Sequence, residues 1–194
     1  MSLQDRIINQ FSDSIQTQQD AMTYLCELIE YASQRLVTTL LNDKKILTCG
    51  NGRSATCAQL LSSSMLNQFE RDRPSLPVIA LTTDTATITA IANDYNFDDV
   101  FAKQLRALGQ NGDILVIYTD GNNSANIAKA ITTAHDKELS VIALTGNNGG
   151  MITPLLRETD IEIRVPSNSN ARIQETHVLI THCLCDLIDH QLFG

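Results

Sequence analysis

From Lys44 onward, short apolar runs alternate with segments of helical periodicity, and this alternation constrains the fold more than any other feature of the chain. Short strands that alternate with helices are typical of a parallel sheet with helices on both faces. The sequence therefore predicts an α/β fold with a doubly wound, five-stranded parallel sheet. The expected strands are Lys45–Cys49, Leu76–Leu81, Asp113–Tyr118, Ser140–Thr145 and Ile161–Val165.

Residues 3–42 carry two apolar stripes at helical spacing, which predict two helices ahead of the first strand. A doubly wound core does not need both of them, so either the chain's own sheet or a neighbouring subunit must cover their stripes. We expect a single domain over residues 1–194, with residues 1–42 at subunit interfaces and the α/β core in residues 43–194. The first stripe is Ile7, Ile8, Phe11 and Ile15, and the second includes Leu25, Leu28, Ile29, Leu36 and Leu40.

Composition excludes several classes of protein. The net charge of −8 argues against direct contact with DNA or RNA, which needs a basic surface. No apolar run is long enough to cross a membrane, and the N-terminus does not have the pattern of a signal peptide. Five cysteines without a secretory signal indicate reduced thiols and a cytoplasmic location.

Cys183 and Cys185 lie beside His182 in a helical pattern, which raises the alternative of a metal site. Residues two positions apart point to different sides of a helix, so these two thiols would chelate one ion poorly. The pattern therefore favours buried structural cysteines over a metal site.

A strand, a Gly-Asn-Gly turn and the start of a helix follow one another in residues 45–54. Helix N-termini attract phosphate groups, and ligands of such sheets bind at the carboxyl ends of the strands. The same turn could also be only a tight connection. We expect a crevice at this edge, formed by residues 50–54, 83–85, 119–124 and 145–148. The predicted ligand-binding residues are Asn51, Gly52, Ser54, Thr119 and Ser124.

Three stretches together resemble the sugar isomerase (SIS) domain family, and in particular its phosphoheptose isomerase branch. They are Cys49-Gly50-Asn51-Gly52-x-Ser54, where x is any residue, the loop 119–124, and Ala171-Arg172-Ile173-Gln174-Glu175. The resemblance implies a flavodoxin-like sheet, a homotetramer and the binding of phosphorylated sugars. It also implies a metal-assisted isomerisation of sedoheptulose 7-phosphate by acid–base catalysis between subunits.

The chain departs from that family at its reactive positions. Where the family has a histidine and a glutamate four residues apart, this sequence has Leu60 and Ser64. Gln174 and His182 match the other two family positions, but they stand about 12 Å apart along a continuous helix. We therefore expect Gln174 and His182 to be vestigial, with no catalytic residues, no metal and no cofactor. Asp120 either adds a repulsive charge to the phosphate loop, turns outward or caps the following helix.

Other stretches are more similar to a branch of the family that associates with the replication initiator DnaA. They include residues 73–81, 87–94, 106–109 and 183–189. This resemblance implies a non-catalytic homotetrameric adaptor that promotes assembly of DnaA at the chromosomal origin, in DNA replication initiation, by multivalency. Leu192 and Phe193 are the predicted partner-binding residues, or they pack on a neighbouring subunit. Two alternatives remain open: a phosphoheptose isomerase and a module that senses a sugar phosphate.

Overall fold

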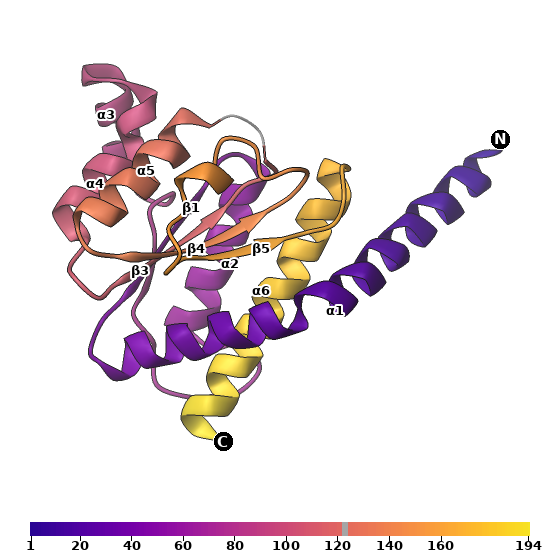
Figure 1. The fold of residues 1–194 in the computed structure, drawn as a ribbon, viewed down its shortest axis with the longest axis horizontal. Helices are drawn as coiled ribbons and strands as arrows, with labels where there is room; N and C mark the ends of the chain where they lie inside the picture. The colour runs from indigo at the N-terminus through magenta and orange to yellow at the C-terminus, as the bar shows by residue number, and fades with distance from the viewer. Residues whose placement is uncertain (122–123) are drawn as a thin grey trace.

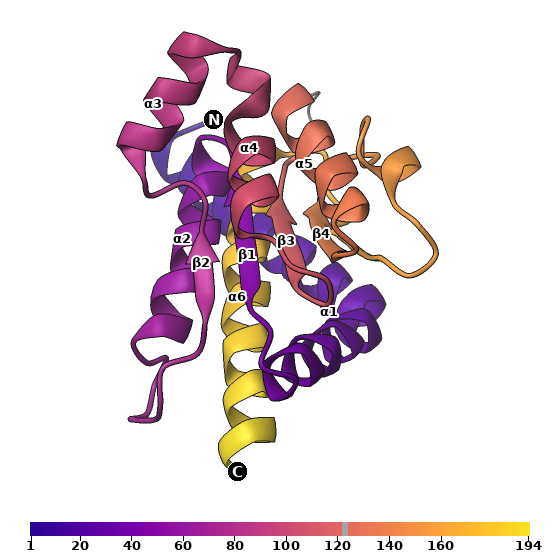
Figure 2. The same cartoon turned by 90° about the vertical axis from the view of Figure 1, so that its left-hand side faces the viewer.

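The sheet has five parallel strands in the order β2-β1-β3-β4-β5, in a computed structural model that describes residues 1–121 and 124–194. Helices cover both of its faces (Figures 1 and 2). This confirms the α/β class and the doubly wound parallel sheet expected from the sequence. The strands are β1 (Ile46–Gly50), β2 (Val78–Ala80), β3 (Ile114–Tyr118), β4 (Ser140–Thr145) and β5 (Ile161–Arg164).

Each face of the sheet has its own apolar core, because successive side chains of a strand point to opposite faces. Ile46 of β1 packs with one cluster, against α1, α2 and α6, whereas Leu47 packs with the other, against α3, α4 and α5. The strands are buried on both faces and are therefore almost wholly apolar. The helices are α1 (Leu3–Leu41), α2 (Arg53–Leu66), α3 (Thr85–Asp94), α4 (Val100–Leu108), α5 (Ala125–Asp136) and α6 (Asn170–Phe193), with 3₁₀ turns η1 (Phe97–Asp99) and η2 (Thr153–Leu155).

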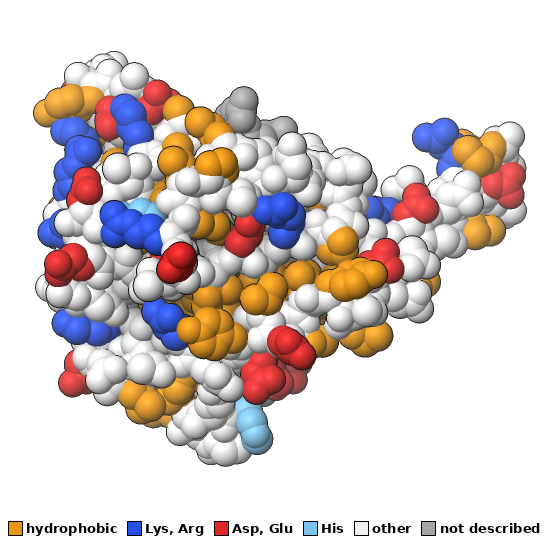
Figure 3. All heavy atoms as spheres, in the orientation of Figure 1, with side chains coloured by type: hydrophobic (Ala, Val, Ile, Leu, Met, Phe, Trp, Pro, Cys, Tyr) orange, Lys and Arg blue, Asp and Glu red, His pale blue; other side chains and the backbone are white. Residues whose placement is uncertain are grey.

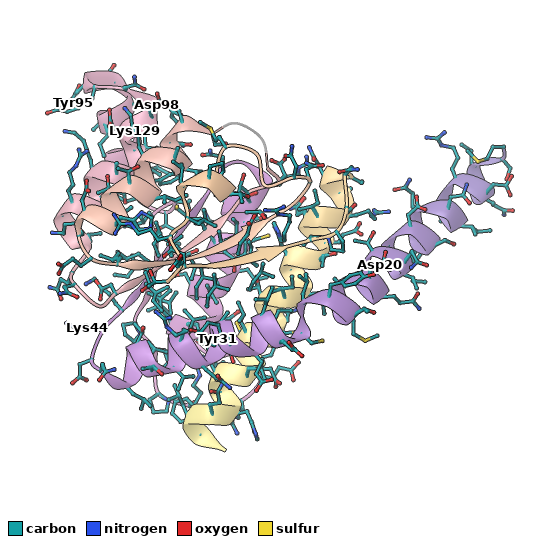
Figure 4. The ribbon with its side chains drawn as sticks, in the orientation of Figure 1. Asp20, Tyr31, Lys44, Tyr95, Asp98 and Lys129 are labelled. Carbon is teal, nitrogen blue, oxygen red and sulfur yellow. The ribbon has the colours of Figure 1, made fainter. Side chains whose placement is uncertain are left out.

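Residues 3–41 form one helix of 39 residues, α1, where two helices were expected. The segment contains neither glycine nor proline, so nothing in it interrupts the backbone hydrogen bonds. Its second half packs beside α6, and its first half extends away from the body (Figure 1). Figure 4 labels one residue on each half: Tyr31 lies beside the body and Asp20 on the extending part.

Element boundaries differ from the sequence predictions mainly beside prolines and at helix ends. The second strand begins at Val78 rather than Leu76, since Pro77 has no N–H for the ladder and the Leu76 N–H bonds Met65 O. Helix α2 ends at Leu66, three residues before the predicted end. The helix predicted from residue 122 begins at Ala125, after the N-cap residue Ser124, and residues 122–123 lie outside the described part of the chain.

Candidate functional site

A cavity of about 270 Å³ opens at the carboxyl ends of β1 and β3. Strands β1 and β3 are neighbours in the sheet although β2 lies between them in the sequence, so this is the switch point of the doubly wound sheet. All five predicted ligand-binding residues line it. The full lining is Asn51, Gly52, Arg53, Ser54, Tyr118, Thr119, Asp120, Ser124 and Ile127, without the other two predicted segments, 83–85 and 145–148.

The glycine at the end of β1 allows α2 to begin directly against the sheet. A Cβ at Gly50 would lie 2.7 Å from the backbone carbon and oxygen of Ser54, closer than real contacts allow. Gly52 has a φ of 53°, in the region that favours glycine, and it is the N-cap residue of α2. The two glycines therefore fix how the first turn of α2 meets the cavity.

Two asparagine amides join the two walls of the cavity. Asn51 Nδ2 donates to Asn126 Oδ1, and Asn126 Nδ2 donates to Asn51 Oδ1, both at 2.8 Å. Asn126 Oδ1 also accepts from the Ile127 N–H at 2.9 Å, and Asn126 is only 2 % exposed. The pair fixes the loop before α2 to the start of α5. Sequence reasoning missed Asn126, because a pairing across 75 residues has no local pattern.

Replacing Asn126 with alanine is expected to lower the free energy of unfolding by about 1–3 kcal/mol, the usual cost of leaving buried polar partners unpaired. Urea unfolding followed by circular dichroism measures this. Asn93, an exposed asparagine at the end of α3, provides the matched control, and Asn93→Ala should change stability much less. Equal effects of the two substitutions would show that the amide pair does not hold the two walls together.

The starts of α2 and α5 both face this cavity without a side-chain cap among the described residues. The N–H groups of Ser54, Ala55 and Ile127 are bonded within the protein, but the two helix dipoles still place a partial positive charge at the cavity, which favours anions. The hydroxyls of Thr119 and Ser124 lie on the same wall as α5. The Thr119 hydroxyl accepts from the Gly121 N–H at 3.3 Å, so it can still donate to a ligand. The arrangement therefore suits a small anion carrying hydrogen-bond acceptors.

A buried polar network lies beneath the cavity floor. The Tyr118 hydroxyl bonds the Thr181 hydroxyl at 2.9 Å, and burial raises the pKa of Tyr118 far above its usual range. His177 Nε2 lies 3.1 Å from the carbonyl oxygen of Thr145. Burial lowers the pKa of His177 to about 4, against the opposing effects of that hydrogen bond and of the charge on Asp120. His177 is therefore neutral near pH 7, and its expected role in packing is confirmed by its 1 % exposure.

The four family positions for metal and acid–base chemistry do not converge in this chain. The Ser64 hydroxyl is hydrogen-bonded with Cys185, and the His182 ring packs against Phe69 at 5.6 Å. Leu60 has no ligating atom, and Gln174 lies on the continuous helix α6, two turns before His182. Among the described residues, no three or more His, Cys, Asp or Glu lie together in a group that could hold a metal ion. These donors do not fit the metal that the resemblance implies.

Arg172, from the stretch that carries the resemblance, and the predicted partner-binding residues Leu192 and Phe193 all lie outside the cavity lining. Arg172 donates to the carbonyl oxygen of Gln10 at 2.7 Å and pairs with Glu175, so it anchors α1 to α6 instead of lining the cavity. Leu192 packs against the apolar core on the α1 side of the sheet. Phe193 is 39 % exposed, with the Arg71 guanidinium 5.9 Å from the centre of its ring.

All five cysteines are free, and no described helix is long and apolar enough to span a membrane.

The fold and the cavity together define a class: an α/β domain with a polar crevice at the switch point of a parallel sheet. The particular family follows from comparison with known proteins. Residues 10–146 match the SIS domain model, which is more than half of the chain. The chain belongs to the SIS domain family.

Relatives of known name extend over the whole chain. It is 59% identical over 194 residues to a phosphoheptose isomerase of Methylococcus capsulatus, with both chains covered completely. It is 56% identical to that of Chromohalobacter salexigens, with 100% of this chain and 98% of the other covered. A phosphoheptose isomerase structure from Francisella tularensis superposes with a TM-score of 0.95 at 48% identity, covering 98% of this chain and 100% of that one. The phosphoheptose isomerase branch is therefore confirmed.

These relatives correct the functional predictions. The prediction of a non-catalytic adaptor for DnaA in replication initiation is wrong, as is the prediction that the chain is not an enzyme, because the full-length relatives are phosphoheptose isomerases. The error came from giving two positions, Leu60 and Ser64, and several short stretches more weight than the whole chain. Neither position lines the cavity of the single chain.

Proposed function

We propose that the chain is a phosphosugar isomerase that binds a phosphorylated heptose in the crevice and interconverts its ketose and aldose forms. The observation that carries this proposal is the similarity to phosphoheptose isomerases over the full length, at 52% to 59% identity. The cavity supports it, because the starts of two helices, two hydroxyls and an asparagine surround a space suited to a polar anion.

The reaction moves a proton between neighbouring carbon atoms and therefore needs an acid–base group at the ligand. Within the described part of the chain, the cavity lining contains a single carboxylate, that of Asp120. Asp120 lies two residues after the end of β3, and its carbonyl oxygen accepts from Asn147 Nδ2 at 2.7 Å, which ties the loop to the residues after β4. We assign the proton transfer to Asp120. The positions of Leu60 and Ser64 take no part in it.

The proposal is tested with purified protein and sedoheptulose 7-phosphate. The wild type should form the aldoheptose phosphate, and EDTA should leave the rate unchanged because the donors do not fit a metal. Asp120→Asn should lower kcat by roughly 100- to 10,000-fold, the range for loss of an acid–base group, while ligand binding is retained. Binding without turnover by the wild type would indicate a sensor of sugar phosphates and would contradict the assignment.

The chain's own copies are the proposed partners, as a homotetramer. The extending half of α1 exposes an apolar stripe with no cover from the described body, and Figure 3 shows apolar side chains along this helix. Surfaces of this kind mark protein–protein contacts. The stripe on the extending half of α1 includes Ile7, Ile8, Phe11, Ile15 and Met22, which are 55% to 68% exposed.

The free cysteines support a reducing compartment such as the cytoplasm.

Phe11→Asp is expected to break this assembly, because it buries a charge in an apolar interface. Light scattering coupled to size exclusion should give about four times 21.3 kDa for the wild type and a smaller mass for the variant. Tyr95→Asp is the control, since Tyr95 is equally exposed, at 67 %, but lies at the end of α3. A smaller mass for both variants, or for neither, would contradict assembly through α1.

A further inference from the structure

A second polar cavity, of about 650 Å³, opens at the edge of the sheet opposite the crevice, at the amino ends of β3 and β4. It lies between the end of α1, the turn before β3 and the first residue of β4. Within the described residues, its lining contains two cations, Arg35 and Lys44, and no carboxylate. The chain as a whole carries a net charge of −8, so a lining with only positive charge departs from the composition of the protein.

Neither cation is used in an ion pair. No carboxylate lies within ion-pair distance of Arg35 or Lys44 among the described residues, and both side chains are half-buried. Two carboxylates of neighbouring turns are bonded elsewhere. Asp113 accepts three hydrogen bonds from the protein, and Glu138 accepts one from the Asn111 amide. The positive charge of the cavity is therefore available to a ligand.

Both cations have a defined place in the cavity. Arg35 Nη2 donates to Ser140 Oγ at 3.1 Å, and Nη1 donates to the Tyr31 hydroxyl at 3.3 Å, so the guanidinium is held against the start of β4. The stem of Lys44 lies along Gly112, where an added Cβ would come within 3.3 Å of Lys44 Cε. Figure 4 labels Tyr31 on α1 and Lys44 just beyond the end of this helix.

A hydroxyl of the lining also lacks a partner. Thr39 is only 8 % exposed and lines the cavity, yet its hydroxyl makes no hydrogen bond with the described residues. A buried hydroxyl without a partner is costly, so such groups usually bond a ligand or an ordered water. The Ser140 hydroxyl accepts from Arg35 and keeps its own proton for a further bond.

The dipole of α1 does not account for this arrangement. The carboxyl end of a helix attracts cations, and α1 ends at this cavity. However, the last carbonyl oxygens are already used, since those of Thr38 and Thr39 accept from N–H groups of Asn42 and Lys44. The Arg35 guanidinium bonds side-chain hydroxyls instead of these carbonyls.

We propose that this cavity is a second ligand site, separate from the crevice, which binds the phosphate group of a small phosphate monoester through Arg35 and Lys44. A phosphate dianion matches the two cations in charge, and arginine binds phosphate through two parallel hydrogen bonds. The phosphate oxygens accept from the hydroxyls of Thr39 and Ser140. The volume lies within the usual range of ligand pockets, roughly 300–1,000 Å³, which leaves room for the organic part of the ester.

Equilibrium dialysis with radiolabelled inorganic phosphate counts the bound anions. The wild type should bind one phosphate more per chain than the double variant Arg35→Gln with Lys44→Gln, and glycerol 3-phosphate, a monoester, should displace that phosphate. Lys44→Gln alone removes no bond among the described residues and should weaken this site by roughly 10- to 100-fold. The matched control, Lys103→Gln with Arg157→Gln, removes the same charges outside the cavity and should bind phosphate as the wild type does.

Thr39→Val tests the unpartnered hydroxyl, because valine keeps the shape of the side chain. Without phosphate, the melting temperature of the variant should be no lower than that of the wild type. At equal phosphate concentrations the wild type should gain more, since a ligand that binds the folded state stabilises it according to its affinity. A lower melting temperature with an unchanged gain from phosphate would indicate a purely structural hydroxyl and would contradict the site.

Equal phosphate counts for the wild type and the double variant would overturn the proposal. Failure of glycerol 3-phosphate to displace the phosphate would contradict a monoester as the ligand. If Lys44→Gln raised the KM for sedoheptulose 7-phosphate as much as it weakened phosphate binding, the two cavities would not be separate sites. Lack of turnover by the wild type, with the difference in phosphate count intact, would contradict the isomerase proposal alone.

Discussion

Replacing Arg73 with methionine is expected to lower the free energy of unfolding by about 3–5 kcal/mol, the cost of leaving one member of a buried ion pair alone. Arg73 Nε lies 2.8 Å from Asp189 Oδ1, and the two side chains are 2% and 6% exposed. The guanidinium also donates to the carbonyl oxygens of Met65 and Ser64, at 2.7 Å and 2.8 Å. Arg73 thus joins the end of α2 to the end of α6.

Urea unfolding of the variant measures this loss. Lys129→Met is the control, since Lys129 pairs with Asp99 at 3.2 Å on the surface, and an exposed pair contributes only about 0–1 kcal/mol. Figure 4 labels Lys129 on α5, at the edge of the body beside η1. A second variant, Arg73→Met with Asp189→Leu, should regain part of the stability by removing the stranded carboxylate. Similar losses from the two single methionine substitutions would contradict the buried-pair account.

The stability of the protein is expected to fall between pH 6.5 and pH 4 because of His177. The pKa of His177 is about 4 in the folded protein and about 6.5 when the chain is unfolded. In that interval the unfolded chain binds a proton that the folded protein excludes, so acid stabilises the unfolded state. The contribution of His177 is fully present above pH 6.5, and it decreases by about 1.4 kcal/mol per pH unit until pH 4.

The comparison of wild type with His177→Gln isolates this effect from the titration of other groups. Glutamine keeps an amide that can donate to the Thr145 carbonyl but cannot take up a proton. The difference in unfolding free energy between the two proteins should therefore change by about 3 kcal/mol across the interval. A constant difference between wild type and His177→Gln would show that His177 titrates normally.

Local patterns predicted the fold well where they involve only neighbouring residues. Strand β4 has the predicted bounds, Ser140–Thr145, because an apolar run between a charged turn and a glycine leaves little choice. The long α1 was predicted as two helices, since the stripes drift around a helix that has no break. A periodic pattern identifies the apolar face of α1, but it does not identify the surface that covers this face.

The candidate site was predictable in part. Residues from β1 and β3 had to meet, because the carboxyl ends of parallel strands lie at the same edge. Arg53 directly follows the Gly-Asn-Gly turn, and its place as the first residue of a helix at that edge of the sheet could have been inferred from the sequence. The Asn51–Asn126 pair and the contact of Arg172 with α1 depend on distant packing, and no spacing in the sequence signals them.

The central claim is that the crevice performs proton transfer on a bound sugar phosphate. The most direct test incubates the wild-type protein with sedoheptulose 7-phosphate in deuterium oxide and follows the carbon-bound hydrogens by nuclear magnetic resonance. Isomerisation through acid–base catalysis predicts the exchange of a C1 hydrogen for deuterium together with the appearance of the aldose phosphate, and the loss of both in Asp120→Asn. Saturated binding of the sugar phosphate with no exchange and no aldose would contradict the claim.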